Sequence, residues 1–186
     1  MPEEKIITEI PVIQRLAAKR EDENWRFRTY VKHRLEMEDE ALDAVVQETT
    51  DAVWSKIDCT QCAHCCRTLQ VVVDHQDAAR LAKRLGMRVP EFKRRYMKYD
   101  EHKEGYFAAM PCPFLKENVC SVYEDRPKAC RDFPYLHEPR FRTRMIMFIE
   151  NTAVCPIVYN TCEQLKSRLE FGKAKAKRAR PERHGR

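Results

Sequence analysis

Glycine and serine are scarce in this chain of 186 residues, which has four glycines and three serines. The glycines are far apart, so the chain lacks the closely spaced glycines with which dinucleotide-binding folds and P-loops approach a phosphate. None of the serines lies in the pattern of a nucleophile elbow. The sequence therefore argues against a nucleotide-binding fold and against a serine hydrolase of that type.

Long apolar runs are also missing. No stretch approaches the roughly 18 apolar residues of a membrane span, and the first residues show no basic segment leading into an apolar one. Hydrophobic residues make up 43% of the chain and charged residues 34%, which is typical of a globular protein. We therefore expect a cytoplasmic protein without a membrane contact, built as one domain with appendages.

The net charge of +6 is unevenly distributed along the chain. Residues 171–186 hold seven Lys or Arg and one Glu, whereas residues 1–170 hold 28 basic and 28 acidic residues. The tail has no apolar periodicity, so we expect it to be solvated and disordered. A weak contact with nucleic acid or with an acidic partner through this tail stays open.

Cysteine is abundant, with nine residues in the chain. In a reducing compartment, closely spaced thiols indicate metal ligands and not disulfides. Four of the nine occur within eight residues, as C59-T-Q-C62-A-H-C65-C66. This spacing predicts a metal site in which thiolates are the ligands.

Helical periodicity precedes and follows this cysteine cluster. Residues 12–35 predict one or two amphipathic helices, and the apolar spacing from residue 38 to 57 predicts another. Residues 69–73 are β-branched and predict a strand, and Asp74 is expected to cap a helix that ends near Gly86. Pro90 is expected to open a further helix. Residues 145–149 predict a strand, and a last helix is expected to run through Leu169.

The stretch from Pro111 to Pro139 has five prolines and three cysteines, with no helical or strand period. A loop this long in a compact domain needs other cross-links, and thiolates bound to a metal would supply them. We therefore predict an α+β fold with a small, irregular, loop-rich, metal-stapled domain and short strands. The predicted boundaries are an N-terminal helical segment at 1–57, a cysteine-cluster domain at 58–170 and the basic tail at 171–186.

The cysteine motifs resemble those of the YkgJ-type cysteine-cluster (CxxCxxCC) family. The resemblance rests on C-x2-C-x2-C-C from Cys59 to Cys66, then C112-P-F-L, C120-S-V-Y-E-D-R-P-K-A-C130-R-D-F-P and C155-P, and it covers Cys59 to Pro156. It implies a zinc- or iron-chelating domain, and such proteins are also described as holding iron–sulfur clusters. Ala63 stands where these proteins often have glycine, which weakens the expectation of a turn with positive φ. A flagellin lysine methylase has a similar cysteine cluster, so an enzymatic role stays open.

Thiolate ligands select zinc, copper(I) or iron–sulfur clusters over magnesium and calcium. The steps of two residues from Cys59 to Cys62 to Cys65 resemble the ferredoxin run, and the Cys-Pro pair at Cys155 is another ferredoxin feature. Arg67 and Arg131 each follow a cysteine and could offset the negative charge of a thiolate centre. We favour an iron–sulfur cluster as the cofactor, with zinc in a structural module as the alternative.

Eight cysteines are candidate metal ligands, and they fill either two sites or one site with thiols to spare. They are Cys59, Cys62, Cys65, Cys66, Cys112, Cys120, Cys130 and Cys155. Cys162 lies beyond the motifs and is expected to be a thiol without a metal. His64 is expected to face solvent or to support a ligand. The pattern favours a metal-binding module, and a metal-dependent enzyme remains the other function class; no catalytic residue and no protein partner follow from the sequence.

Overall fold

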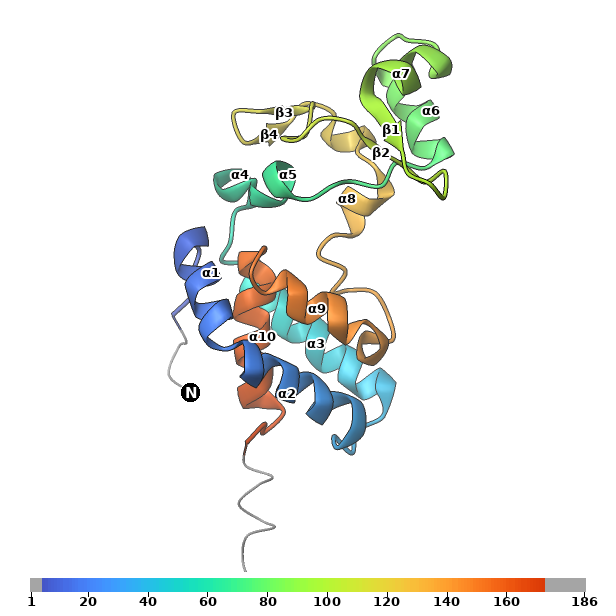
Figure 1. Cartoon of the computed structure of the whole chain (residues 1–186). Coiled ribbons are helices and arrows are strands. Elements are labelled where there is room, and N and C mark those ends of the chain that lie inside the picture. The colour runs from blue at the N-terminus through green and yellow to red at the C-terminus, as the bar shows by residue number, and fades with distance from the viewer. Residues whose placement is uncertain (1–4, 173–186) are drawn as a thin grey trace, which may run out of the picture. The chain divides into compact units, whose positions relative to one another are not determined.

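The computed structural model describes residues 5–172 and divides them into two compact units (Figure 1). The helical unit comprises the chain up to Ile57 together with the chain from Leu136 onward. The cysteine unit comprises Asp58–Tyr135. Most of the predicted basic tail, residues 173–186, lies outside the described residues.

The helical unit is built from five α-helices and one 3-10 helix within the described residues. They are α1 (Ile10–Lys19), α2 (Glu21–His33), α3 (Asp39–Trp54), η2 (Phe141–Arg144), α9 (Met145–Asn151) and α10 (Pro156–Arg168). Helix α10 packs on α3, and α9 packs on α2. Phe27, Leu42 and Leu165 are fully buried in this unit. The helices predicted at 12–35, 38–57 and up to Leu169 are confirmed.

The predicted strand at 145–149 is wrong, because this stretch forms helix α9. Met145, Phe148 and Ile149 are its buried residues, and their spacing of three and four is that of one helix face. A short run of apolar residues does not distinguish a strand from a buried helix by itself.

After the cysteine unit, residues 140–142 are held in the helical unit by two groups of hydrogen bonds. The carboxylate of Asp43 accepts hydrogen bonds from the backbone N–H of Arg140, at 2.6 Å, and of Phe141, at 2.8 Å. Arg142 donates to the Asp39 carboxylate at 2.7 Å and to the carbonyl of Met37 at 2.6 Å. Residues 136–170, which the sequence groups with the cysteine cluster, therefore pack here with the N-terminal helices.

The cysteine unit combines short helices with two small antiparallel hairpins. Its helices are α4 (Cys59–Cys62), α5 (His64–Thr68), α6 (His75–Arg84), α7 (Val89–Tyr96), η1 (Tyr123–Asp125) and α8 (Lys128–Asp132). Strand β1 (Met97–Tyr99) pairs with β2 (Gly105–Phe107), and β3 (Leu115–Lys116) pairs with β4 (Val119–Cys120). The short strands beside the helices agree with the predicted α+β class.

Local signals position α6 and α7 as the sequence predicts. Asp74 caps α6 by accepting from the N–H of Asp77 at 2.7 Å in a capping box, and Gly86 follows with a φ of +65°. Pro90 lies in the first turn of α7. The strand predicted at 69–73 is reduced to a single bridge between Val72 and Tyr106.

No described helix of this chain has the length and apolar character required to cross a membrane.

Candidate metal centre

Two short helices carry the first four cysteines. Asp58 caps α4 by accepting from the N–H of Thr60 at 2.8 Å and from its hydroxyl at 2.7 Å, and these hydrogen bonds lower the pKa of Asp58. Ala63 joins α4 to α5 with φ 45° and ψ 21°, in the left-handed region. The turn with positive φ that the alanine argued against is therefore present, although alanine is strained in that conformation.

A tight hairpin brings Cys120 back beside the segment that contains Cys112. The turn residues Glu117 and Asn118 have φ of 47° and 72°, as in the two-residue type I′ turn. In the register of the hairpin, Leu115 pairs with Cys120, and Cys112 and Cys120 both pack against one apolar cluster. The sequence reasoning found no strand period here, because two-residue strands are too short to show one.

Backbone N–H groups point at two of these sulfur atoms. The N–H groups of Phe114 and Leu115 hydrogen-bond to the thiol of Cys112, and the N–H of Val122 hydrogen-bonds to that of Cys120. The N–H of Cys112 in turn donates to the carbonyl of Cys66 at 2.8 Å. The N–H···S hydrogen bonds favour the ionised form of each sulfur. The backbone hydrogen bond between Cys112 and Cys66 ties the segment of Cys112 to α5.

Four thiols of the cysteine unit act on one another through their charges, namely those of Cys66, Cys112, Cys120 and Cys130. Burial raises the pKa of Cys112, Cys120 and Cys130, that of Cys130 to about 12. In every pair among the four, the charge of one thiolate raises the pKa of the other further. The four thiols cannot all ionise together without a cation to offset their charge.

Cys66 interacts both with the other three of these cysteines and with the other cysteines of the first motif. The thiol of Cys65 lies 4.0 Å from the sulfur of Cys66, and its hydrogen bond, followed by the charge of Arg67, lowers the pKa of Cys66 to about 7. The charges of Cys62 and Cys66 also raise the pKa of Cys59, after burial as the larger cause. Cys66 therefore interacts with both groups of thiols.

Two arginines place positive charge beside the four thiols. Arg67 donates to the carbonyl of Cys62 at 2.8 Å and also binds the side chain of Asn118 in the β3–β4 turn. The guanidinium of Arg126 lies 3.8 Å from the ring centroid of Tyr123 and lowers the pKa of Cys120 and Cys130. The sequence reasoning did not connect Arg126 with the thiols. It named Arg131 instead, whose guanidinium donates to the carbonyl of Arg126 at 3.3 Å.

A buried carboxylate fixes the segment that leads to Cys130. Asp77 is 3% exposed and accepts from the N–H of Lys128 at 3.1 and 3.2 Å. It also forms an ion pair with Arg80 at 2.5 Å. Arg80 donates to the carbonyls of Asp125 and Arg126 at 3.2 and 3.0 Å. Helix α6 therefore positions the start of α8, in which Cys130 lies.

The remaining candidate ligands have different surroundings. Cys59 is exposed as a residue although its thiol is partly desolvated, while Cys62 and Cys65 are partly buried. Cys155 belongs to the helical unit, where it is buried and precedes α10. Cys162, which the sequence excluded as a ligand, is buried within α10, and this burial raises its pKa to about 12.

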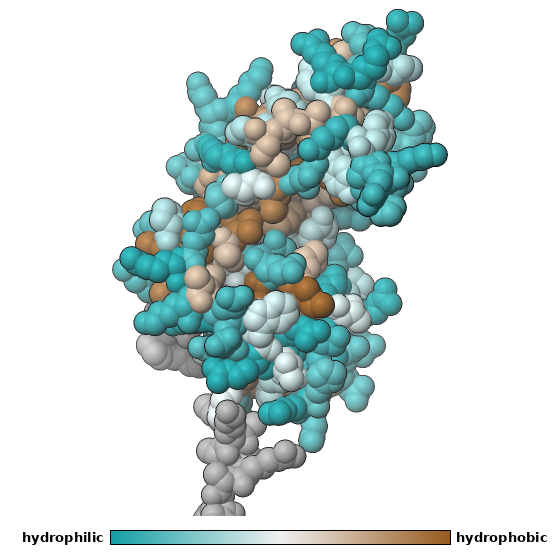
Figure 2. All heavy atoms as spheres, viewed as in Figure 1, coloured by the Kyte–Doolittle hydropathy of each residue, from teal (hydrophilic) through white to brown (hydrophobic). Residues whose placement is uncertain are grey.

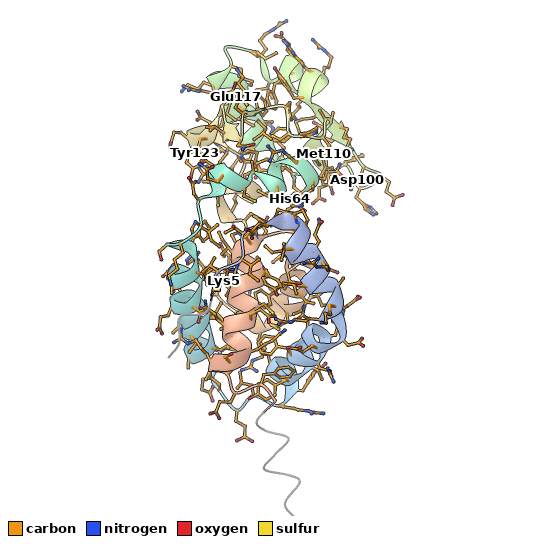
Figure 3. The ribbon with its side chains drawn as sticks, turned by 90° about the vertical axis from the view of Figure 1, so that its left-hand side faces the viewer. Lys5, His64, Asp100, Met110, Glu117 and Tyr123 are labelled. Atoms are coloured by element: carbon orange, nitrogen blue, oxygen red, sulfur yellow. The ribbon has the colours of Figure 1, made fainter. Side chains whose placement is uncertain are left out.

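His64 begins α5 at one edge of the cysteine unit, and Glu117 and Tyr123 lie elsewhere on the same unit (Figure 3). Burial lowers the pKa of His64, and the charge of Arg67 adds to this. Within residues 5–172, no three His, Cys, Asp or Glu side chains are already arranged around a single ion position. The donor set of thiolates with N–H···S hydrogen bonds nevertheless fits a soft metal or a cluster.

Comparison with known proteins gives one family. The model of the CxxCxxCC family, described as a "putative zinc- or iron-chelating domain", matches residues 58–163. No curated protein and no solved structure gives a significant match to the chain. The family match includes the whole cysteine unit and continues through α9 into α10. The matched residues exceed half of the chain, and the chain therefore belongs to the CxxCxxCC family of zinc- or iron-chelating domains.

Proposed function

We propose that this protein holds an iron–sulfur cluster through Cys66, Cys112, Cys120 and Cys130. The observation that carries the proposal is that the charges of these four thiols act on one another, although they come from three separate segments of one compact unit. An iron–sulfur cluster with four cysteine ligands requires this kind of donor set. When bound, the cluster supplies one-electron transfer.

The chain's own groups stabilise thiolates at this position. The N–H groups of Phe114, Leu115 and Val122 stabilise the negative charge on two of the sulfurs. Arg67 and Arg126 add positive charge from opposite ends of the cysteine motifs. Hydrogen bonds to the sulfurs and the net charge around a cluster are two of the features by which proteins set its reduction potential.

The spacing of the cysteines favours iron–sulfur over zinc. The two arginines beside the four thiols suit either centre, because four thiolates leave negative charge on a zinc ion and on an oxidised cluster alike. The chain has the ferredoxin-like steps from Cys59 to Cys62 to Cys65. Cys59, Cys62 and Cys65 of the same unit stay candidate ligands, for a second centre or as thiols without a metal. Cys155 of the helical unit also stays a candidate ligand.

The test is anaerobic purification followed by measurement of iron, zinc and acid-labile sulfide, together with a visible spectrum. We expect a brown protein that contains iron and sulfide. Cys120→Ser is expected to lose the colour, because a hydroxyl replaces a soft thiolate poorly. The matched control is Cys162→Ser, which removes a buried thiol of the helical unit and should keep full metal content.

Two results would contradict the proposal. A colourless protein with stoichiometric zinc would replace the cluster by a structural zinc site. Full iron and sulfide content in a Cys112→Ser/Cys130→Ser double variant would exclude these cysteines as the ligands.

A further inference from the structure

A basic segment lies in the cysteine unit, apart from the cysteines. Residues 80–98 hold eight Lys or Arg and a single acidic residue, Glu91. This segment forms the end of α6, the turn to α7, α7 itself and most of β1, and these elements pack on one another. Its exposed cations, which we call the basic face, are Lys83, Arg84, Arg88, Arg94, Arg95 and Lys98. Figure 2 shows hydrophilic side chains over the α6–α7 end of this unit.

Acidic partners for these cations are few. Arg84 forms an ion pair with Asp125 at 3.6 Å, and it is the only member of the basic face in an ion pair within residues 5–172. The carboxylate of Asp100, directly after β1, accepts hydrogen bonds from the N–H groups of His102 and Glu104 and from the hydroxyl of Tyr106. The positive charge of the basic face is therefore largely uncompensated by the chain itself.

Helix stability explains only part of this charge. Lys83 and Arg84 lie in the last turn of α6, and Arg94 and Arg95 lie in the last turn of α7, where cations interact favourably with the helix dipole. Arg88 occupies the N-cap of α7 without a capping hydrogen bond, and a cation is unfavourable at that end of a helix. Lys98 lies on a strand. The helix dipole therefore explains neither Arg88 nor Lys98.

Aromatic rings are interleaved with the cations. Tyr99 follows Lys98 on β1 and is 50% exposed. The guanidinium of Arg95 lies 5.4 Å from the ring centroid of Tyr96. Alternating cations and aromatic faces are the features with which proteins bind single strands, since phosphates pair with the cations and bases stack on the rings.

We infer that the basic face, together with Tyr99, binds single-stranded nucleic acid. The phosphate backbone would contact Arg88, Arg94 and Lys98, and one base would stack on the exposed ring of Tyr99, which lies on the other side of β1 from Lys98. This inference is independent of the metal centre, because none of these residues is a candidate ligand.

The experiment measures fluorescence anisotropy of a labelled single-stranded RNA of about 20 nucleotides with the full, metal-loaded chain. The variant Arg88→Glu/Arg94→Glu/Lys98→Glu should weaken binding at least about tenfold, and the slope of log affinity against log salt should become shallower by roughly 2. The control Arg15→Glu/Lys19→Glu/Arg34→Glu makes the same change in net charge at exposed sites of the helical unit. It should change the affinity by less than about threefold, since those residues are not part of the proposed site.

The aromatic contact has a separate test. Tyr99→Ala should weaken RNA binding about fivefold or more with an unchanged salt slope, whereas Tyr99→Phe should retain the affinity. A duplex of the same sequence should bind more weakly than the single strand.

Four outcomes would overturn the inference. They are equal losses in the two charge-reversal variants, duplex binding as tight as single-strand binding, unchanged affinity in Tyr99→Ala, and binding to anionic vesicles without binding to RNA. Loss of all RNA binding on changing Lys173, Lys175 and Lys177 to Gln, with none in the basic-face variant, would assign the contact to the tail instead.

Discussion

The two units of this protein are stabilised in different ways. In the helical unit, long helices bury a continuous set of large apolar side chains, and α10 lies along α3. In the cysteine unit, α6, α7, β1 and β2 share a smaller apolar cluster. The segments 58–70 and 108–135, which carry the seven cysteines of this unit, bury only three apolar side chains besides proline, those of Ala63, Phe114 and Val122.

This difference shows where a metal matters to the fold. Apolar burial contributes about 25 cal/mol per Å², so three buried side chains cannot offset the conformational entropy lost by some forty ordered residues at ~1–2 kcal/mol each. The free energy of metal binding becomes folding free energy where a site is not preformed. The helical unit needs no such contribution.

Metal removal should therefore have the largest effect, and it should be confined to one unit. After anaerobic treatment with a chelator, residues 58–70 and 108–135 should lose protection from amide hydrogen exchange by roughly a hundredfold or more, while α3 and α10 stay protected. Hydrogen exchange followed by mass spectrometry measures the protection of the cysteine segments and of the two helices in one sample. Equal protection of the cysteine segments with and without metal would contradict the comparison.

A substitution in the core of the helical unit serves as the control for metal removal. Leu42→Ala removes a fully buried side chain of α3 and should lower the free energy of unfolding of the helical unit by about 2–5 kcal/mol. The metal content of the folded variant should stay at the level of the unmodified chain.

Metal affinity should depend steeply on pH. The pKa values of Cys112, Cys120 and Cys130 are raised above the ordinary range of a thiol, so these groups are protonated at neutral pH without metal. Binding must displace at least these three protons, and the affinity therefore falls as the pH falls, by about a thousandfold per pH unit between roughly pH 6 and 8. Competition titrations with cobalt(II) would measure the slope, and a slope near zero would show that the thiols do not coordinate.

A smaller effect should separate positioning of Cys130 from general stability. Asp77→Asn weakens the attachment of Arg80 and of the Lys128 N–H, and we expect it to lower metal affinity about 10- to 100-fold. In the metal-loaded variant, alkylation followed by peptide mass mapping should find Cys130 reactive while Cys112 stays protected.

Asp43→Asn is the matched control for this prediction, because Asp43 also accepts from two backbone N–H groups, in the helical unit. It should lower the melting temperature without changing metal affinity. Equal affinities in the two variants would reduce Asp77 to a merely structural role.

The smallest effect concerns the turn between α4 and α5. Ala63 has a positive φ, which a β-branched side chain adopts only with strain. Ala63→Val should lower the stability of the metal-loaded cysteine unit by about 1–2 kcal/mol, whereas Ala63→Gly should stay within about 1 kcal/mol of the unmodified chain. Denaturant titration followed by the visible absorption of the centre measures both.

The sequence by itself determined the features that depend on neighbouring residues. Thiols at short spacing specify soft-metal chemistry wherever they fold, because ligand type is a property of the side chain. The capping box at Asp74, the start of α7 at Pro90 and the periodic helices of the helical unit likewise follow from interactions within a few residues. These predictions agree with the structure.

Only the tertiary structure decided which distant groups meet. The sequence does not show that the charge of Cys66 acts on the thiols of Cys112, Cys120 and Cys130, which lie 46 to 64 positions further along the chain. Arg126, and not the expected Arg131, is the arginine of that loop whose charge acts on these thiols, and residues 145–149 became a helix because the packing available to them buried a helical face. The sequence shows the cations of residues 80–98, but only the structure shows which of them are exposed. Such pairings depend on contacts between residues far apart in the chain, which composition and spacing do not encode.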